Sequence, residues 1–388
     1  MRHSELRGKA LLFLFLLWFL WFSNICTRTI FAPILPLLED EFVITHAQAS
    51  GIFMFQAAGY GLAMFFSGFF AGRVGYKKSI VGSLIVSSLV FFLIPFVKVF
   101  SVLYLLGFFL GLSGGVYMPS AIPLITEYFA EKDWGKALAI HDSGAAVGIF
   151  SIPLIAIFLL LFLEWRGIFT VFAVIVLLTA IIFSLACHEV KVAPPEKRVL
   201  GNLMKTQSLW MMAAIFTTIS GANMGIYNII PLYFTKELSL SIEHANTLLG
   251  ISKLGGIGVA LISGFVVDRV NLKRVMFITM VCTGILTVLL GATQVRYVGI
   301  CLFLQTVFVA GFYPVGLVCI AKMFSRETRS LATGFILTFS VIGGSGIIPY
   351  LLGLSGDLVN FRFGIVIVGI LLCLSSLLVF SLKEIESY

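Results

Sequence analysis

The chain is 388 residues long, 60% of its residues are hydrophobic and only 11% are charged. In soluble domains about a quarter of all residues are charged, so this composition excludes an ordinary soluble protein and predicts a membrane protein. The formal net charge of +8 could suit nucleic-acid binding, but the basic residues lie in short segments between apolar runs. They therefore indicate membrane topology, and no nucleic-acid partner is expected.

Crossing a bilayer takes about 20 helical residues. Six apolar runs of this kind lie near 10–38, 47–71, 79–97, 101–127, 135–163 and 167–187, and six more near 208–235, 245–267, 275–292, 297–321, 330–354 and 363–382. Residues 188–207 form the longest polar stretch and hold the only Pro-Pro pair. The predicted fold is an all-α membrane protein, with twelve transmembrane helices in two pseudo-symmetric six-helix bundles. The domains are 1–187 and 208–388, joined by a cytoplasmic linker at 188–207.

Neither a metal site nor a cofactor is predicted. The six cysteines are isolated and form no C-x-x-C pair, which argues against a disulfide framework as well. No P-loop is present, so an ion or substrate gradient must drive any transport. The first apolar run is too long for a signal peptide and lacks an A-x-A site, which favours a retained first helix.

The loop charges predict the orientation. With the N-terminus inside, 19 of the 26 lysines and arginines fall in cytoplasmic segments and five fall in outer loops. This bias predicts a multi-pass protein of the cell (inner) membrane with both termini in the cytoplasm. The remaining two cations, Arg28 and Lys253, belong to no loop.

The two halves resemble each other at a constant offset of 196 residues, as from Gly68 to Gly264. The segment GFFAGRVGYKK (68–78) aligns with GFVVDRVNLKR (264–274), and the same offset pairs Tyr117 with Tyr313. This series indicates a duplicated six-helix unit. Parallel repeats of this kind are a transporter architecture, in which substrate binds near the midplane.

On these residues the chain resembles the major facilitator superfamily over essentially its whole length. The family's loop motif is G-x-x-x-D-R-x-G-R/K-R/K. Gly72 stands where the aspartate of the first copy belongs, and Asn271 replaces the second glycine of the second copy. Gly144 and Gly148 are followed by a proline only at Pro153, unlike the family's proton antiporters, and the sugar-porter P-E-S-P-R signature is absent.

The resemblance implies that the two motif copies act as conformational latches, in which a carboxylate is favoured beside a helix N-terminus. The copies comprise Gly68, Arg73, Gly75, Lys77 and Lys78, and Gly264, Asp268, Arg269, Lys273 and Arg274. Glu127 is expected to pair with Arg73 in place of the missing aspartate. Alternatively, these basic residues only set topology.

Arg28 lies near the middle of the first span, and Lys253 lies about one turn from the centre of the eighth. A cation at the bilayer centre costs about 2.5–3.5 kcal/mol on insertion scales, so each is a candidate functional residue. The resemblance places one cation in each half facing the same cavity. A cavity with surplus positive charge predicts an anionic substrate. The alternative is a structural role, such as an ion pair with Asp142.

Polar residues on neighbouring spans complete the candidate substrate site. They are Asn24, Gln56, Tyr60, Tyr117, Asn223, Tyr227, Asn228, Gln305, Tyr313 and Ser340. Individually, each such residue is more often a helix-packing contact than a ligand. Pro33, Pro36 and Pro231 are expected to loosen the outer ends of the first and seventh spans.

Asp142 and His141 form the only acid–imidazole pair inside a predicted span, and they are the candidates for proton coupling. The sequence thus predicts a secondary transporter of a small organic anion, in particular a carboxylate, that works as a monomer by alternating access with proton coupling or exchange. The alternative is an exporter of drug-like or lipid substrates, which the buried cations disfavour. A membrane enzyme is not expected.

Overall fold

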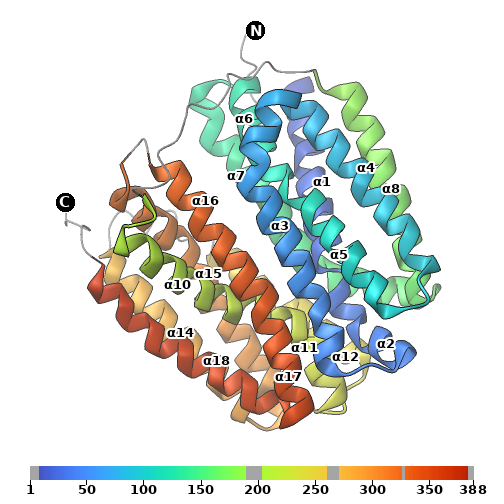
Figure 1. The fold of residues 1–388 in the computed structure, drawn as a ribbon, viewed down its shortest axis with the longest axis vertical. Helices are drawn as coiled ribbons and strands as arrows, with labels where there is room; N and C mark the ends of the chain where they lie inside the picture. The colour runs from blue at the N-terminus through green and yellow to red at the C-terminus, as the bar shows by residue number, and fades with distance from the viewer. Residues whose placement is uncertain (1–7, 189–202, 260–270, 326–327, 383–388) are drawn as a thin grey trace. The chain divides into compact units, whose positions relative to one another are not determined.

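The computed structural model describes residues 8–188, 203–259, 271–325 and 328–382, which are helical with no β-strand (Figure 1). Its contacts divide the chain into two compact units. Unit 1 comprises Met1–Phe31 and Phe55–Glu196, and unit 2 comprises Ala32–Met54 and Lys197–Tyr388. Residues 32–54 thus group with the second half of the chain, which the sequence-based division at the linker does not anticipate.

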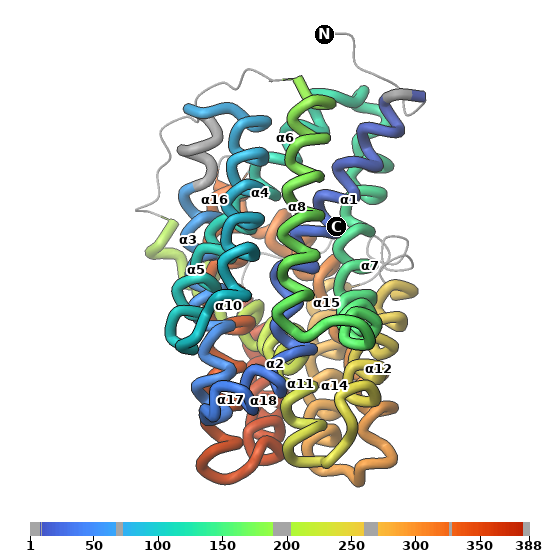
Figure 2. The backbone as a smooth tube through the Cα atoms, turned by 90° about the vertical axis from the view of Figure 1, so that its right-hand side faces the viewer, coloured from blue at the N-terminus to red at the C-terminus, as the bar shows by residue number. Residues whose placement is uncertain are grey.

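Unit 1 is built from long helices joined by short turns. They are α1 (Lys9–Thr29), most of α3 (His46–Val74), α4 (Tyr76–Leu93), α5 (Phe100–Gly115), α6 (Tyr117–Tyr128), α7 (Trp134–Leu160) and α8 (Trp165–Ala186). α1 packs on α7, and α4 packs on α8, as Figure 2 shows. α3 and α5 approach so closely that a Cβ on Gly111 would overlap the Gln56 carbonyl oxygen. Small residues permit such backbone contact in membrane bundles.

Unit 2 begins with most of α2 (Phe31–Phe42) and the first turns of α3. Its other helices are α10 (Gln207–Ser220), α11 (Ile226–Lys236), α12 (Ile242–Ser252), α14 (Leu272–Ala292), α15 (Val298–Met323), α16 (Arg329–Phe339), α17 (Ile348–Leu358) and α18 (Phe361–Ser375). α14 packs along both α15 and α18. Met212, Phe216, Met276 and Phe312 are fully buried in the core of this unit.

Eleven helical stretches of the described residues are long and apolar enough to cross a membrane, in the predicted order. The eighth predicted span, 245–267, includes residues 260–267, which lie outside the described part. Large apolar side chains are exposed on helix faces, including Phe158 of α7 at 58% and Leu185 of α8 at 82%. Lipid contact accounts for an apolar exterior of this extent.

The first predicted span is broken into α1 and α2 at Ile30. Pro33 causes this break, because it has no N–H to donate to the Thr29 carbonyl four residues earlier and its ring crowds that carbonyl. The seventh and eleventh spans each contain a π-helical stretch, η3 (Gly221–Gly225) and η6 (Ser340–Ile347), which the sequence analysis missed. The two stretches pack together, and a Cβ on Gly225 would lie 2.7 Å from the Gly344 carbonyl oxygen.

Candidate functional site

Arg28 lies in the last turn of α1, and its guanidinium carbon is 3.8 Å from the centre of the Tyr60 ring on α3. The side chain is partly exposed. Among the described residues, no carboxylate lies within ion-pair distance of Arg28. The cation–π contact holds the guanidinium over the ring but leaves its charge unbalanced.

The helices that carry Arg28 and Tyr60 also carry two buried amides, and each amide has an unused polar atom. Asn24, one turn earlier on α1, donates from Nδ2 to the Gly114 carbonyl at 3.2 Å, while its Oδ1 has no protein partner. Gln56, one turn before Tyr60 on α3, has no partner for Nε2. Asn24 is only 7% exposed and Gln56 only 6%. A Cβ on Gly114 would lie 3.5 Å from Arg28 Cδ and 3.6 Å from Tyr60 Cδ2, so α1 and α3 converge on this face of α5.

Tyr117 joins the candidate substrate residues to the candidate coupling pair. Its hydroxyl donates to the Leu17 carbonyl at 2.9 Å and is hydrogen-bonded to His141 Nε2 at 3.0 Å. Trp21 stacks on Tyr117 and donates from Nε1 to Asp142 Oδ1 at 3.3 Å. His141 is buried, whereas Asp142 is exposed on the protein surface. Asp142 therefore contacts Trp21 and forms no ion pair with Arg28.

Lys253, which directly follows α12, lies in a chain of hydrogen bonds within unit 2. Its ammonium donates to Asn223 Oδ1 at 3.1 Å and lies 5.1 Å from the centre of the Tyr227 ring. Asn223 in turn donates from Nδ2 to the Tyr313 hydroxyl at 3.3 Å. The structure thus brings together four of the predicted residues around the π-helical stretch η3. In the part of the chain that the structure covers, no carboxylate pairs with Lys253.

Three other predicted residues donate to backbone carbonyls of neighbouring helices. Gln305 donates to the Ala222 carbonyl at 2.6 Å, and Ser340 donates to the Phe216 carbonyl at 2.9 Å. Asn228 donates to the Ser345 carbonyl at 3.2 Å, which Pro349 cannot bond because it lacks an N–H. These contacts favour the packing alternative for Gln305, Asn228 and Ser340.

The first motif copy lies at the junction of α3 and α4. Gly75 precedes α4 with a φ of 97°, a conformation that glycine adopts without strain. Asn271, its counterpart in the repeat, precedes α14 and accepts the Arg274 N–H on its side chain at 3.1 Å. The replacement of glycine by asparagine thus supplies a side-chain helix cap. Lys273 donates to the Leu382 carbonyl at 2.5 Å.

The predicted Arg73–Glu127 pair is absent: both residues are described, and no ion pair joins them. Gly68 lies within α3. Gly264, Asp268 and Arg269 fall outside the described residues, and the latch function stays a prediction.

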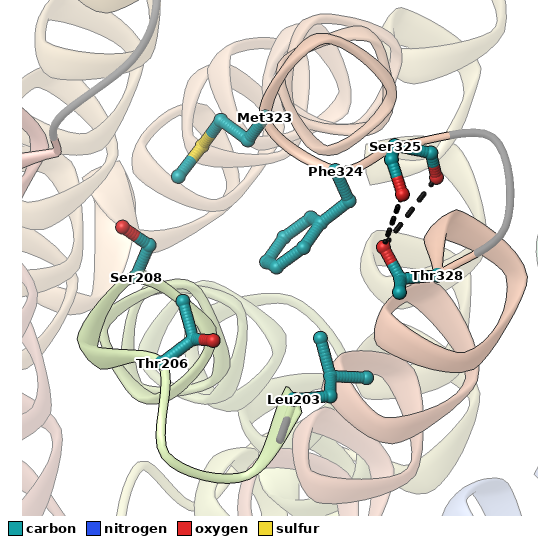
Figure 3. A pocket seen from close by; sticks show the side chains of 7 residues that line it. All are labelled: Leu203, Thr206, Ser208, Met323, Phe324, Ser325 and Thr328. Carbon is teal, nitrogen blue, oxygen red and sulfur yellow. Dashed lines mark hydrogen bonds between the residues drawn. The ribbon is translucent and has the colours of Figure 1, made fainter. Parts of the chain in front are cut away.

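A cavity of 260 Å³ lies in unit 2 beside the start of α10 and the end of α15 (Figure 3). Its lining consists of Leu203, Thr206, Ser208, Met323, Phe324, Ser325 and Thr328. None of these residues is charged, and none belongs to the candidate site. An anion would find no counter-charge in this lining. Among the described residues there is also no cluster of three or more histidine, cysteine or acidic side chains that could hold a metal ion.

Membrane-length helices, an internal repeat and two cations that pair with no carboxylate among the described residues are the features of a multi-pass membrane transporter. The sequence model of the Major Facilitator Superfamily matches residues 17–272 and 211–387. The chain therefore belongs to the Major Facilitator Superfamily and is a transporter rather than an enzyme.

Relatives and solved structures agree with this family. The chain is 25% identical over 349 residues to a probable nitrate transporter, NarT, of Staphylococcus carnosus, with 84% of this chain and 85% of the relative covered. It is 21% identical over 403 residues to a probable L-galactonate transporter of Escherichia coli, with 95% of this chain and 87% of the relative covered. A bacterial homologue of the human lysosomal transporter Spinster has the same fold, with a TM-score of 0.80 at 14% identity, and 97% of each chain is covered.

Proposed function

We propose that this transporter carries a small organic anion by alternating access, and that the Arg28 guanidinium is the principal contact for the negative charge. The observation that carries the proposal is the lack of any carboxylate beside Arg28 or Lys253 among the described residues. A cation without a counter-ion is costly at membrane depth, and a bound anion would supply the missing charge. Relatives named for nitrate and for L-galactonate support an anionic substrate.

The unused atoms of the two buried amides favour a hydroxylated carboxylate over nitrate. Asn24 Oδ1 can only accept a hydrogen bond, whereas Gln56 Nε2 can only donate one. Nitrate offers acceptors alone, so it would leave Asn24 Oδ1 unpaired. A hydroxyl both donates and accepts, and a substrate that carries a carboxylate and hydroxyls could therefore engage Arg28, Asn24 and Gln56 together.

A thermal-shift series on the purified protein tests this proposal, because a ligand stabilises the state that it binds. The probes are L-galactonate, hexanoate, nitrate and galactose, which separate the contributions of charge and of hydroxyl groups. We expect L-galactonate to raise the Tm most, hexanoate and nitrate to raise it less, and neutral galactose to leave it unchanged. Stabilisation by galactose without stabilisation by any anion would overturn the proposal.

For energy coupling, we propose Asp142 with His141 as the group that exchanges protons. The contacts of Asp142 with Trp21 and of His141 with Tyr117 connect this pair to α1, the helix that carries Arg28. In proteoliposomes, Asp142→Asn is expected to abolish accumulation driven by a pH gradient while sparing substrate exchange. Normal accumulation by this variant would exclude the role and leave anion exchange as the mechanism.

The orientation and the oligomeric state are further parts of the proposal. The loop charges support cytoplasmic termini in the cell membrane, and transport by a monomer is expected. Tags at residue 2, in the 188–207 linker and at the C-terminus should all report a cytoplasmic location, and a tag near Thr45 should report the outside. An outside location of any of the first three tags would contradict the topology.

A further inference from the structure

A cluster of five charged or titratable side chains surrounds the connection between α2 and α3 in unit 2. Its members are Glu39, Asp40, His46, Lys236 and Asp357. His46 Nδ1 lies 2.7 Å from Glu39 Oε2, and Lys236 Nζ lies 3.7 Å from Glu39 Oε1 and also pairs with Asp40. Glu39 is only 7% exposed. We call this group the α2–α3 charge cluster.

Asp357 on α17 fastens the first turn of α3. Its two carboxylate oxygens accept the backbone N–H groups of His46 and Ala47, each at 2.8 Å. The N–H groups in the first turn of a helix have no partner within the helix, and a carboxylate is favoured there. One turn earlier on α17, a Cβ on Gly353 would overlap Ser50 Oγ and the His46 carbonyl. α17 thus abuts the start of α3.

Both ends of the segment Ala32–Met54 lead within a few residues to candidate substrate residues. Ala32–Met54 belongs to unit 2, while the residues directly before and after it belong to unit 1. Arg28 lies four residues before Ala32, and Gln56 lies two residues after Met54. A change in how unit 2 holds this segment would therefore act on α1 and α3 next to Arg28, Gln56 and Tyr60.

The charges of the cluster are balanced better when the imidazole is protonated. Three carboxylates face one lysine, so the cluster carries −2 with a neutral His46 and −1 with a protonated one. The nearby Glu237 pairs with Arg362 at 3.5 Å, and Phe361 packs on the His46 ring at 4.8 Å. Imidazole is the side chain that ordinarily titrates between about pH 5 and pH 8.

We propose that His46 is the titrating group of a pH-operated latch: when protonated, its charge holds Glu39 within the segment Ala32–Met54 and Asp357 on α17, so that the segment is fastened to the rest of unit 2, and deprotonation loosens it. The imidazolium donates a charge-assisted hydrogen bond to Glu39, and such bonds are about twice as strong as neutral ones. Loss of the proton weakens this bond and adds one uncompensated negative charge to the cluster. The latch does not depend on which anion the protein carries.

The amides of His46 and Ala47 report the latch directly, because Asp357 bonds both of them. Hydrogen exchange of the purified full-length protein is measured by mass spectrometry at about pH 5.5 and about pH 7.5, and is corrected for the intrinsic effect of pH on amide exchange. We expect the protection of these amides to be at least about threefold greater at the lower pH. Equal protection at the two pH values would overturn the proposal.

Two variants and a matched control identify the group responsible. His46→Gln keeps a hydrogen-bonding side chain but cannot titrate, so its protection should be independent of pH. Glu39→Gln removes the carboxylate and should lower the protection at about pH 5.5 to the wild-type level at about pH 7.5. His244→Gln, at an exposed histidine of α12 in the same unit, should keep the wild-type pH response. A wild-type pH response in both His46→Gln and Glu39→Gln would refute the latch.

Discussion

The two intramembrane cations differ in what surrounds them. Arg28 lies over the Tyr60 ring, and the buried amides Asn24 on α1 and Gln56 on α3 keep one unused polar atom each. Lys253 donates to Asn223, which donates onward to Tyr313. The residues around Arg28 therefore have polar atoms free to bond a ligand, whereas the polar groups around Lys253 already bond one another.

The two cations are alike in charge but differ in the hydrogen-bonding groups that remain free for a ligand. Both cations offer a positive charge without a carboxylate partner among the described residues. An anion at Lys253 would have to share the ammonium with Asn223, and one N–H of that ammonium is already committed. An anion at Arg28 meets a planar fork that can grip a carboxylate with two parallel bonds. We therefore expect Arg28 to dominate binding and Lys253 to contribute less.

The largest expected effect is that of Arg28→Ala, which should weaken binding of the anionic substrate by about 2–5 kcal/mol. Arg28→Lys should fall between this variant and wild type, because it keeps the charge but loses the fork. The affinities are measured by titration calorimetry on the purified variants. Arg296→Ala is the matched control, because Arg296 also lies over an aromatic ring, Tyr297 at 4.5 Å, but is exposed. Wild-type affinity in Arg28→Ala would reduce Arg28 to a structural role.

A smaller effect is expected at the second cation. Lys253→Ala should weaken anion binding by about 1.5–3 kcal/mol, the range for a hydrogen bond to a charged group. Asn223→Ala keeps the ammonium and should leave the affinity within about 0.5 kcal/mol of wild type, while the lost hydrogen bond costs about 1 kcal/mol of folding stability. If Asn223→Ala weakened binding as much as Lys253→Ala, Asn223 itself would be a contact for the anion and the contrast with Arg28 would fail.

Much of the helical architecture could be predicted because apolar runs of membrane length are a strong signal. The residues around Lys253 were also predictable, since each is a polar residue within such a run. The π-helical stretches were not, because hydrophobicity does not encode the hydrogen-bond register of a helix. These stretches supply the hydrogen-bond acceptors of two predicted residues: Gln305 donates to a carbonyl in η3, and Asn228 donates to a carbonyl in η6.

The α2–α3 charge cluster escaped the sequence analysis for a different reason. Glu39 directly follows the predicted span 10–38, and Lys236 directly follows the predicted span 208–235, so the sequence indicates only that each flanks a span. Their partners are remote in the chain: Asp40 and Lys236 are 196 residues apart, and His46 and Asp357 are 311 apart. Without a structure or covarying sequences, nothing connects such positions. The same holds for the grouping of Ala32–Met54 with unit 2.

The smallest expected effect, and the most selective one, concerns two buried glutamines. Gln56 Nε2 has no partner, whereas Gln305 Nε2 bonds the Ala222 carbonyl at 2.6 Å. Gln56→Leu should leave folding stability unchanged or raise it, because it removes an unpaired buried polar group. It should also weaken binding of a hydroxylated carboxylate by about tenfold, or about 1.4 kcal/mol, and leave the affinity for hexanoate unchanged.

Gln305→Leu should show the opposite pattern: it leaves the Ala222 carbonyl unpaired, which costs about 1–3 kcal/mol of stability, and it should not alter the preference for hydroxylated anions. Thermal unfolding combined with competition between L-galactonate and hexanoate measures both quantities in each variant. The two variants are compared because a general disturbance of packing would lower both folding stability and the preference for hydroxylated anions, whereas each variant is expected to lower only one of them. If Gln56→Leu lost stability and kept its preference for hydroxylated anions, Gln56 would be a packing residue like Gln305, and the unused atoms beside Arg28 would no longer favour a hydroxylated substrate.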